Sequence, residues 1–194
     1  MGAALATGND EYREDFHSWN SSFEHVEFDN LDIIEDRLSS GEFAAFIVEP
    51  IQGEGGVNVP SPGYLKACEK ICRKYKTLYV LDEVQTGLGR TGYMFACEKE
   101  NVEPDIILLS KALGGGLMPI SACISNARAW CAEFGLKHSS TFANNHLACH
   151  IGYSVINELC NKPELLEGAK TKGQYLSEQL HLLTQRWPDV FHSA

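Results

Sequence analysis

The sequence of 194 residues lacks any apolar run near the roughly 20 residues that a membrane-spanning helix needs, so no transmembrane segment is predicted. The chain also has fewer basic than acidic residues, with 16 Lys and Arg and 26 Asp and Glu, which gives a net charge of −10. This deficit argues against nucleic acid and anionic membranes as partners, since an acidic surface is repelled by both. The first residues lack the basic flank of a signal peptide.

A pattern of paired cysteines is missing too. The seven cysteines are odd in number and scattered, so neither a disulfide framework nor a metal motif is indicated. Cys68 and Cys72 share one face of an expected helix and are interpreted as reduced core thiols rather than as a metal pair. His138, His146 and His150 also lack a metal-ligand spacing, and we predict no metal. Reduced thiols favour a reducing compartment, so we expect a cytoplasmic protein.

What the chain does contain is an alternation of short apolar runs with helical patterns. Short runs flanked by glycine or polar residues predict buried strands, at 43–48, 78–81, 106–109 and 120–124. Apolar residues at helical spacing and capping signals predict helices, at 29–40, 64–75, 95–100, 126–134, 145–160 and 164–186. This alternation argues for an α/β fold with a mostly parallel sheet and helices on both faces.

Two of the expected strands end at chemically useful residues. The run 78–81 leads into Asp82, and the run 106–109 leads to Lys111, just before three glycines. In α/β sheets the functional groups lie beyond the carboxyl ends of the strands. A buried acid and a buried amine at neighbouring strand ends suit a cofactor that needs one partner for a ring nitrogen and one for an aldehyde. The simpler alternatives are a helix-capping Asp82 and an exposed Lys111.

The residues around these two positions carry a resemblance. Residues 81–92 read LDEVQTGLGRTG, and residues 110–116 read SKALGGG. Both segments, and the separation of 111 − 82 = 29 positions, resemble the class III pyridoxal-phosphate aminotransferases, a group that includes ornithine, acetylornithine, putrescine and other ω-amino transaminases. The resemblance implies the fold-type I large domain. It assigns residues 1–160 to a partial cofactor-binding domain and residues 161–194 to a long helix leading towards a C-terminal small domain.

The resemblance also implies roles for individual side chains. Lys111 would form the Schiff base with pyridoxal phosphate and then shuttle a proton, which requires a neutral amine with a lowered pKa. Asp82 would keep the ring nitrogen protonated, and Val84 would pack on one ring face. Gln85 would hydrogen-bond the ring hydroxyl. Thr141 would reach the cofactor phosphate of a neighbouring subunit, which implies a homodimer. Adjacent to this set, Glu83 should point to the other side of its strand and act structurally.

Two carboxylates are further candidates, one at the end of the run 43–48 and one in the glycine-rich loop that follows it. Glu49 and Glu54 lie at the mouth of the sheet, and Glu54 resembles a gate glutamate that pairs with an arginine. A plain surface carboxylate is nearly as good an account of Glu54. The family's phosphate loop is not recognisable in residues 1–40, and the small domain with its substrate arginine would follow residue 194. We therefore expect a central piece of an enzyme, inactive by itself.

The implied activity is transamination with pyridoxal 5'-phosphate, from an amine or amino acid donor to a 2-oxo acid or aldehyde acceptor. Amino-group migration and decarboxylation on the same cofactor are alternatives. Gln85 favours transamination over migration, because aminomutase relatives usually carry a different residue there. A different class of function also stays open, namely a non-catalytic module of a larger synthase.

Overall fold

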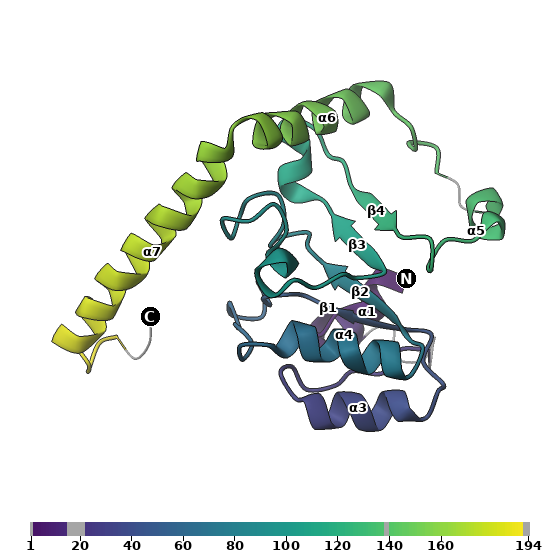
Figure 1. Cartoon of the computed structure of the whole chain (residues 1–194), viewed down its shortest axis with the longest axis horizontal. Coiled ribbons are helices and arrows are strands. Elements are labelled where there is room, and N and C mark those ends of the chain that lie inside the picture. Colours follow the sequence, from purple (N-terminus) through teal and green to yellow (C-terminus); the bar gives the residue numbers. More distant parts are fainter. Residues whose placement is uncertain (1, 15–21, 138–139, 192–194) are drawn as a thin grey trace.

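A parallel sheet with one antiparallel strand forms the centre of the molecule (Figure 1). The computed structural model describes residues 2–14, 22–137 and 140–191. The strands, in their spatial order, are β1 (Ala45–Val48), β2 (Leu78–Asp82), β3 (Ile106–Leu109) and β4 (Ala122–Ser125). β1, β2 and β3 are parallel, whereas β4 pairs antiparallel with β3. The predicted α/β class and mostly parallel sheet are confirmed.

The predicted helices appear in order along the chain, and α1, α2 and η3 are additional helices that were not predicted. Within the described residues, three short helices, α1, α2 and α5, and two 3₁₀ helices, η2 and η3, accompany four longer ones. Their bounds are α1 (Gly2–Ala6), α2 (Asp10–Arg13), α3 (Leu31–Ser39), α4 (Tyr64–Lys74), η2 (Ala96–Glu100), η3 (Lys111–Gly114), α5 (Ala132–Lys137), α6 (His146–Asn161) and α7 (Pro163–Arg186). Asn30 caps α3 by accepting a hydrogen bond from the Ile33 N–H at 3.2 Å, as its residue type suggests.

The helix expected at 126–134 is wrong in its first half. Asn126 Oδ1 accepts hydrogen bonds from the N–H groups of Arg128 (2.9 Å) and Ala129 (3.1 Å), which closes a local turn. Such side-chain bonds compete with helix formation, because they satisfy the same backbone donors. The helix α5 therefore begins only at Ala132.

One face of the sheet is covered by two helical layers. Tyr79 and Leu81 of β2 are fully buried in a cluster with Leu65 of α4, and α3 packs outside α4, which Figure 1 shows between the sheet and α3. Each such side chain contributes roughly 1.5–3 kcal/mol of burial free energy. Cys68 and Cys72 belong to this cluster as free, fully buried thiols, and burial raises the pKa of both to about 12. The interpretation of these two as core thiols is confirmed.

A buried carboxylate connects α4 to the amino ends of β2 and β3. Asp105, which is 1% exposed, accepts hydrogen bonds from Arg73 Nη1 (2.6 Å), the Tyr79 N–H (2.9 Å) and Asn126 Nδ2 (3.1 Å). Burial alone would raise the pKa of Asp105. The hydrogen bonds from Tyr79, Arg73 and Asn126 outweigh that effect and lower the pKa below its usual value.

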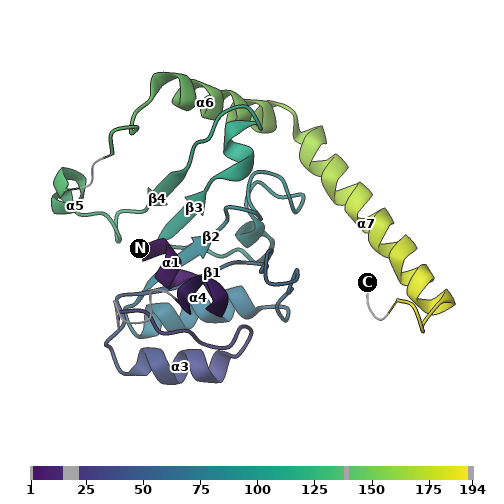
Figure 2. The ribbon, with the colours of Figure 1, turned by 180° about the vertical axis from the view of Figure 1, so that it is seen from behind.

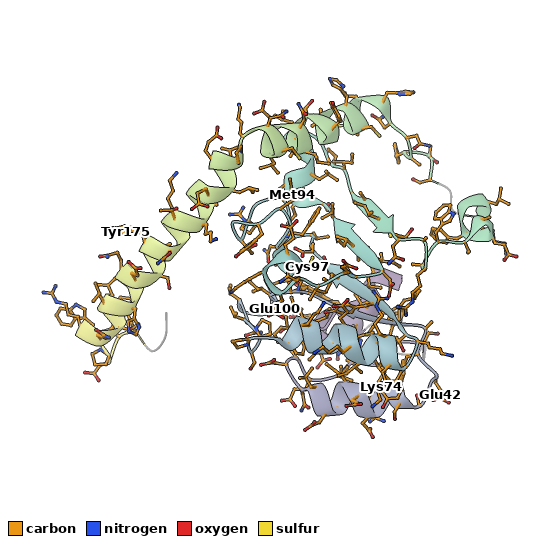
Figure 3. The ribbon with its side chains drawn as sticks, viewed as in Figure 1. Glu42, Lys74, Met94, Cys97, Glu100 and Tyr175 are labelled. Atoms are coloured by element: carbon orange, nitrogen blue, oxygen red, sulfur yellow. The ribbon has the colours of Figure 1, made fainter. Side chains whose placement is uncertain are left out.

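The C-terminal helices are arranged differently. α6 packs on η3, and α7 leaves the end of α6 and projects beyond the sheet (Figures 1 and 2). None of the residues of α7 is buried. Figure 3 shows the contrast, with Cys97 inside the sheet–helix body and Tyr175 on the projecting helix, where it is 64% exposed. No helix in the described ranges is both long enough and apolar enough to span a bilayer.

Candidate active site

A cleft of about 840 Å³ opens beside the carboxyl ends of β2 and β3. That volume lies within the range of ligand sites, roughly 300–1,000 Å³. Five segments line it, namely the loop after β1, the loop after β2 at 84–91, the start of η3, the segment after η3 through Gly116, and α7 through Ala169. Of the predicted site residues, the cleft brings together Lys111, Val84 and Gln85.

Lys111 begins η3, two residues after β3 ends. Its φ of 42° lies in the left-handed region, which is uncommon for a residue with a side chain and is typical of functional sites. The segment is held in place because Ser110 Oγ donates to the Ile120 carbonyl (3.1 Å) and the Leu113 N–H donates to the Ser110 carbonyl (2.9 Å). The expectation of a buried amine is wrong, since Lys111 is exposed.

Asp82 ends β2 and lies opposite Leu108 of β3, so it occupies the strand next to the one that leads to Lys111. The side chain is partly rather than fully buried and does not line the cleft. Its Oδ1 accepts the Val84 N–H at 2.9 Å, which is an Asx turn and not a helix cap. Within the described part of the chain Oδ2 accepts no hydrogen bond, so it is available to a ligand.

Glu83 sets the shape of the loop that follows β2. It is 1% exposed, and its carboxylate accepts hydrogen bonds from Thr86 Oγ1 (2.6 Å), the Ala96 N–H (3.0 Å) and the Cys97 N–H (2.9 Å). These bonds join the start of the loop to the start of η2. The structural role expected for Glu83 agrees with this geometry, and its consequence is a fixed position for the loop that carries Val84 and Gln85.

Gly53 is a site residue that the sequence analysis missed. A Cβ on Gly53 would overlap Oε1 of Gln85, so the Gln85 amide lies directly on this glycine. The loop is closed by paired backbone hydrogen bonds between Gln52 and Asn58 (3.0 and 2.9 Å). The sequence shows that this loop is rich in glycine, but nothing in it says which glycine meets which side chain.

The remaining predicted residues lie outside the cleft lining. Glu49 Oε2 accepts the Gly53 N–H at 3.0 Å and so stabilises the loop, while Glu54 Oε1 accepts the Tyr12 hydroxyl at 3.0 Å. That hydrogen bond to Glu54 raises the pKa of Tyr12. Thr141 lies in an exposed turn after α5. The described residues contain no cluster suited to a metal ion, and His138 lies outside them.

Lys111 lies just beyond a strand, in a cleft that the loops after two parallel strands help to line. This arrangement places the chain among the fold-type I pyridoxal-phosphate enzymes, as part of their large domain. More narrowly, it belongs to the class III aminotransferases, because the family model described as Aminotransferase class-III matches residues 3–193.

Solved structures agree with this assignment. The ornithine aminotransferase of Toxoplasma gondii is 37% identical with a TM-score of 0.81, over 95% of this chain and 42% of that one. An acetylornithine aminotransferase from Elizabethkingia anophelis is 38% identical with a TM-score of 0.77, over 84% and 41%. An (S)-enantioselective omega-transaminase from Thermomicrobium roseum is 32% identical with a TM-score of 0.83, over 95% and 46%. The chain therefore spans less than half the length of these relatives.

Proposed function

We propose that this chain forms part of a pyridoxal-phosphate-dependent aminotransferase, which moves an amino group from an amine or amino acid donor to a 2-oxo acid or aldehyde acceptor. The observation that carries the proposal is the strained, cleft-lining Lys111 beyond β3, within a chain of the class III family. The relatives span ornithine, acetylornithine and omega-amino chemistry, so the proposal stays at the level of amino and oxo compounds.

The residues present fit the ring end of pyridoxal phosphate. Within the described ranges, the Lys111 amine makes no ion pair and Asp82 Oδ2 accepts no hydrogen bond, while the Gln85 amide is held against Gly53. Lys111 would bond to the aldehyde, Asp82 to the ring nitrogen and Gln85 to the ring hydroxyl, with Val84 against the ring. When bound, this cofactor supplies the electron sink that stabilises charge next to the reacting carbon.

The chain's own contribution is positioning and proton transfer. With the cofactor bound, the Lys111 amine would take up the proton that leaves the substrate carbon and would deliver it to the carbon on the other side of the amino nitrogen. Glu83 fixes the loop behind Val84 and Gln85 through its three hydrogen bonds. Thr141 is assigned to the phosphate of a neighbouring subunit. Its exposed turn supports that role, and a homodimer follows from it.

Covalent labelling tests the proposal. The protein is incubated with pyridoxal phosphate, reduced with borohydride and mapped by peptide mass spectrometry. We expect the label on Lys111 and its loss in Lys111→Ala, while Lys99→Ala, which removes an exposed lysine outside the cleft, keeps it. A label distributed over other lysines would contradict the assignment.

The contact between Gly53 and Gln85 offers a sharper test. Neither Gly53 nor Gly55 has a left-handed φ, but only at Gly53 would a Cβ displace Gln85, since Gly55 has no neighbour closer than 3.5 Å. Gly53→Ala should weaken cofactor binding by about tenfold, equivalent to about 1.4 kcal/mol, and Gly55→Ala should not. In a Gln85→Ala background the Gly53→Ala effect should disappear. A loss that persists there would show that Gly53 acts through some other contact.

Product analysis of the full-length enzyme that contains this chain separates the alternative reactions. Transamination consumes an amino acceptor, whereas amino-group migration and decarboxylation proceed without one. A non-catalytic module of a synthase would give neither product nor label at Lys111. Dependence of product on added 2-oxo acid is the expected result.

A further inference from the structure

The helix α6 packs on η3, the 3₁₀ helix that Lys111 begins. Ala148 and Gly152 are the buried residues of α6, and Val155 and Leu159 continue the same face at helical spacing. Leu159 packs against a cluster of buried leucines that includes one residue of η3. This face of α6 therefore lies against the segment that carries Lys111.

Two glycines permit this close approach. A Cβ on Gly152 would lie 3.4 Å from Ile120 Cδ1 and 3.6 Å from Leu113 Cδ1. In the opposite direction, a Cβ on Gly115 would lie 3.1 Å from Val155 Cγ2. Gly115 ends η3 with a φ of +61°, so it is needed for its backbone as well as for space. The space at Gly152 accepts a methyl group at most, and a larger side chain would push η3 away from α6.

Lys111 needs such support because its backbone is strained. A left-handed φ is unfavourable for a residue with a side chain and persists only where the surrounding contacts fix it. Hydrogen bonds join Ser110 Oγ to the Ile120 carbonyl and the Leu113 N–H to the Ser110 carbonyl. Leu113, which is 4% exposed, and Ile120 are the same two residues that face Gly152. The helix α6 thus holds both partners of the hydrogen-bonded segment around Lys111.

We propose that Gly152 and Val155 are positioning residues for Lys111, so that α6 fixes the amine where it meets the aldehyde of the cofactor. Neither residue lines the cleft, so each acts through η3 and not by contact with a ligand. A displaced η3 would let the Lys111 backbone relax towards an ordinary φ and would move the amine with it. This inference rests on the proposed aminotransferase function, because that function requires the amine of Lys111 at this place.

The test compares two helical glycines in the full-length enzyme that contains this chain. Gly152→Val adds two methyl groups beyond the Cβ and should displace η3. Gly173→Val makes the same change in α7, where nothing lies within 4 Å of the Cβ position. The readout is the borohydride-fixed label at Lys111, measured against the concentration of pyridoxal phosphate. Gly152→Val should raise the half-saturating concentration about tenfold, equivalent to about 1.4 kcal/mol, and Gly173→Val should change it by less than about twofold.

Further variants separate positioning from a general loss of folding. Ile120→Val removes only the Cδ1 methyl group nearest to Gly152, so it should recover part of the loss in a Gly152→Val background. Gly152→Ala should label like the wild type, because a single methyl group fits. Val155→Ala, which removes the methyl group facing Gly115, should raise the half-saturating concentration about threefold. Before any cofactor is added, hydrogen exchange of residues 110–118 should be faster in Gly152→Val than in Gly173→Val.

Each outcome decides the assignment. Unchanged labelling or unchanged hydrogen exchange in Gly152→Val, an equal loss in Gly173→Val, or no recovery with Ile120→Val would overturn the positioning role. Wild-type labelling at Lys111 would preserve the proposed function even then. If the wild type carries no label at Lys111, the proposed function fails and this inference fails with it.

Discussion

Two regions of the molecule use their apolar residues in opposite ways. From α3 to β3, residues such as Ile34, Tyr79 and Leu81 are at most 1% exposed. In α7, Leu176 is 57% exposed and Leu182 is 55% exposed, and no residue of the helix is buried. Both regions show clear apolar periodicity, so periodicity predicts that a helix forms but not that another element covers it.

The difference arises from connectivity. The chain returns from α4 directly into β2, which places the apolar face of α4 on the sheet. α7 instead contacts the rest of the chain near its beginning, at the turn that contains Gly89 and Gly92, and its later turns project away (Figures 1 and 2). Stability should therefore be concentrated in the first region, and three predictions test this, from the largest effect to the smallest.

Truncating matched leucines should show the largest contrast. Leu81→Ala removes a fully buried side chain from the central strand and should cost about 3 kcal/mol of unfolding free energy, because it leaves a cavity. Leu180→Ala, at a position 39% exposed on α7, should cost less than about 1 kcal/mol. Urea unfolding of both variants measures the difference. Equal losses would mean that α7 is covered in solution and would remove the contrast between the regions.

The buried carboxylate of Asp105 should make the stability of the first region depend on pH. Asp105→Asn should cost about 2 kcal/mol near neutral pH, since three donors lose a charged acceptor. The pKa of Asp105 is lowered on folding, so its contribution is full above the unfolded pKa of about 3.9 and is lost as pH falls through the folded pKa. The gap between wild type and variant should therefore shrink with acidification.

Urea titrations at several pH values check this behaviour. The exposed Asp36→Asn serves as the control, and its difference from wild type should be small at neutral pH. A gap for Asp105→Asn that stays constant down to strongly acidic pH would contradict the role assigned to this carboxylate.

Two glycines test the junction between the regions, where the smallest effect is expected. Gly92 has a φ of +83° and faces the Lys170 backbone, so Gly92→Ala should cost about 1 kcal/mol. Gly173 lies within α7 with nothing near its Cβ position, so Gly173→Ala should add about 0.5 kcal/mol of stability. Opposite signs in thermal unfolding are expected. A loss at both positions would show that α7 is packed along its whole length.

Much of the fold was predictable because it depends on local chemistry. The apolar runs became strands, the cap at Asn30 formed, and Glu83 took a structural position. The start of α5 was missed because the Asn126 side chain makes a turn whose strength depends on where Asp105 lies. The exposure of Lys111 and the contact between Gly53 and Gln85 were beyond prediction, since both depend on segments that meet only after folding.

The sequence by itself determined the family, the strand ends that carry Asp82 and Lys111, and the acidic balance of the chain. These properties depend only on which residues are present and in what order. The tertiary structure decided which residues share the cleft and which support it. Gly53 and Gly152 were only members of a loop and a helix until folding brought them against Gln85 and Leu113. A distance between side chains far apart in sequence is set by packing, and packing is a property of the whole fold.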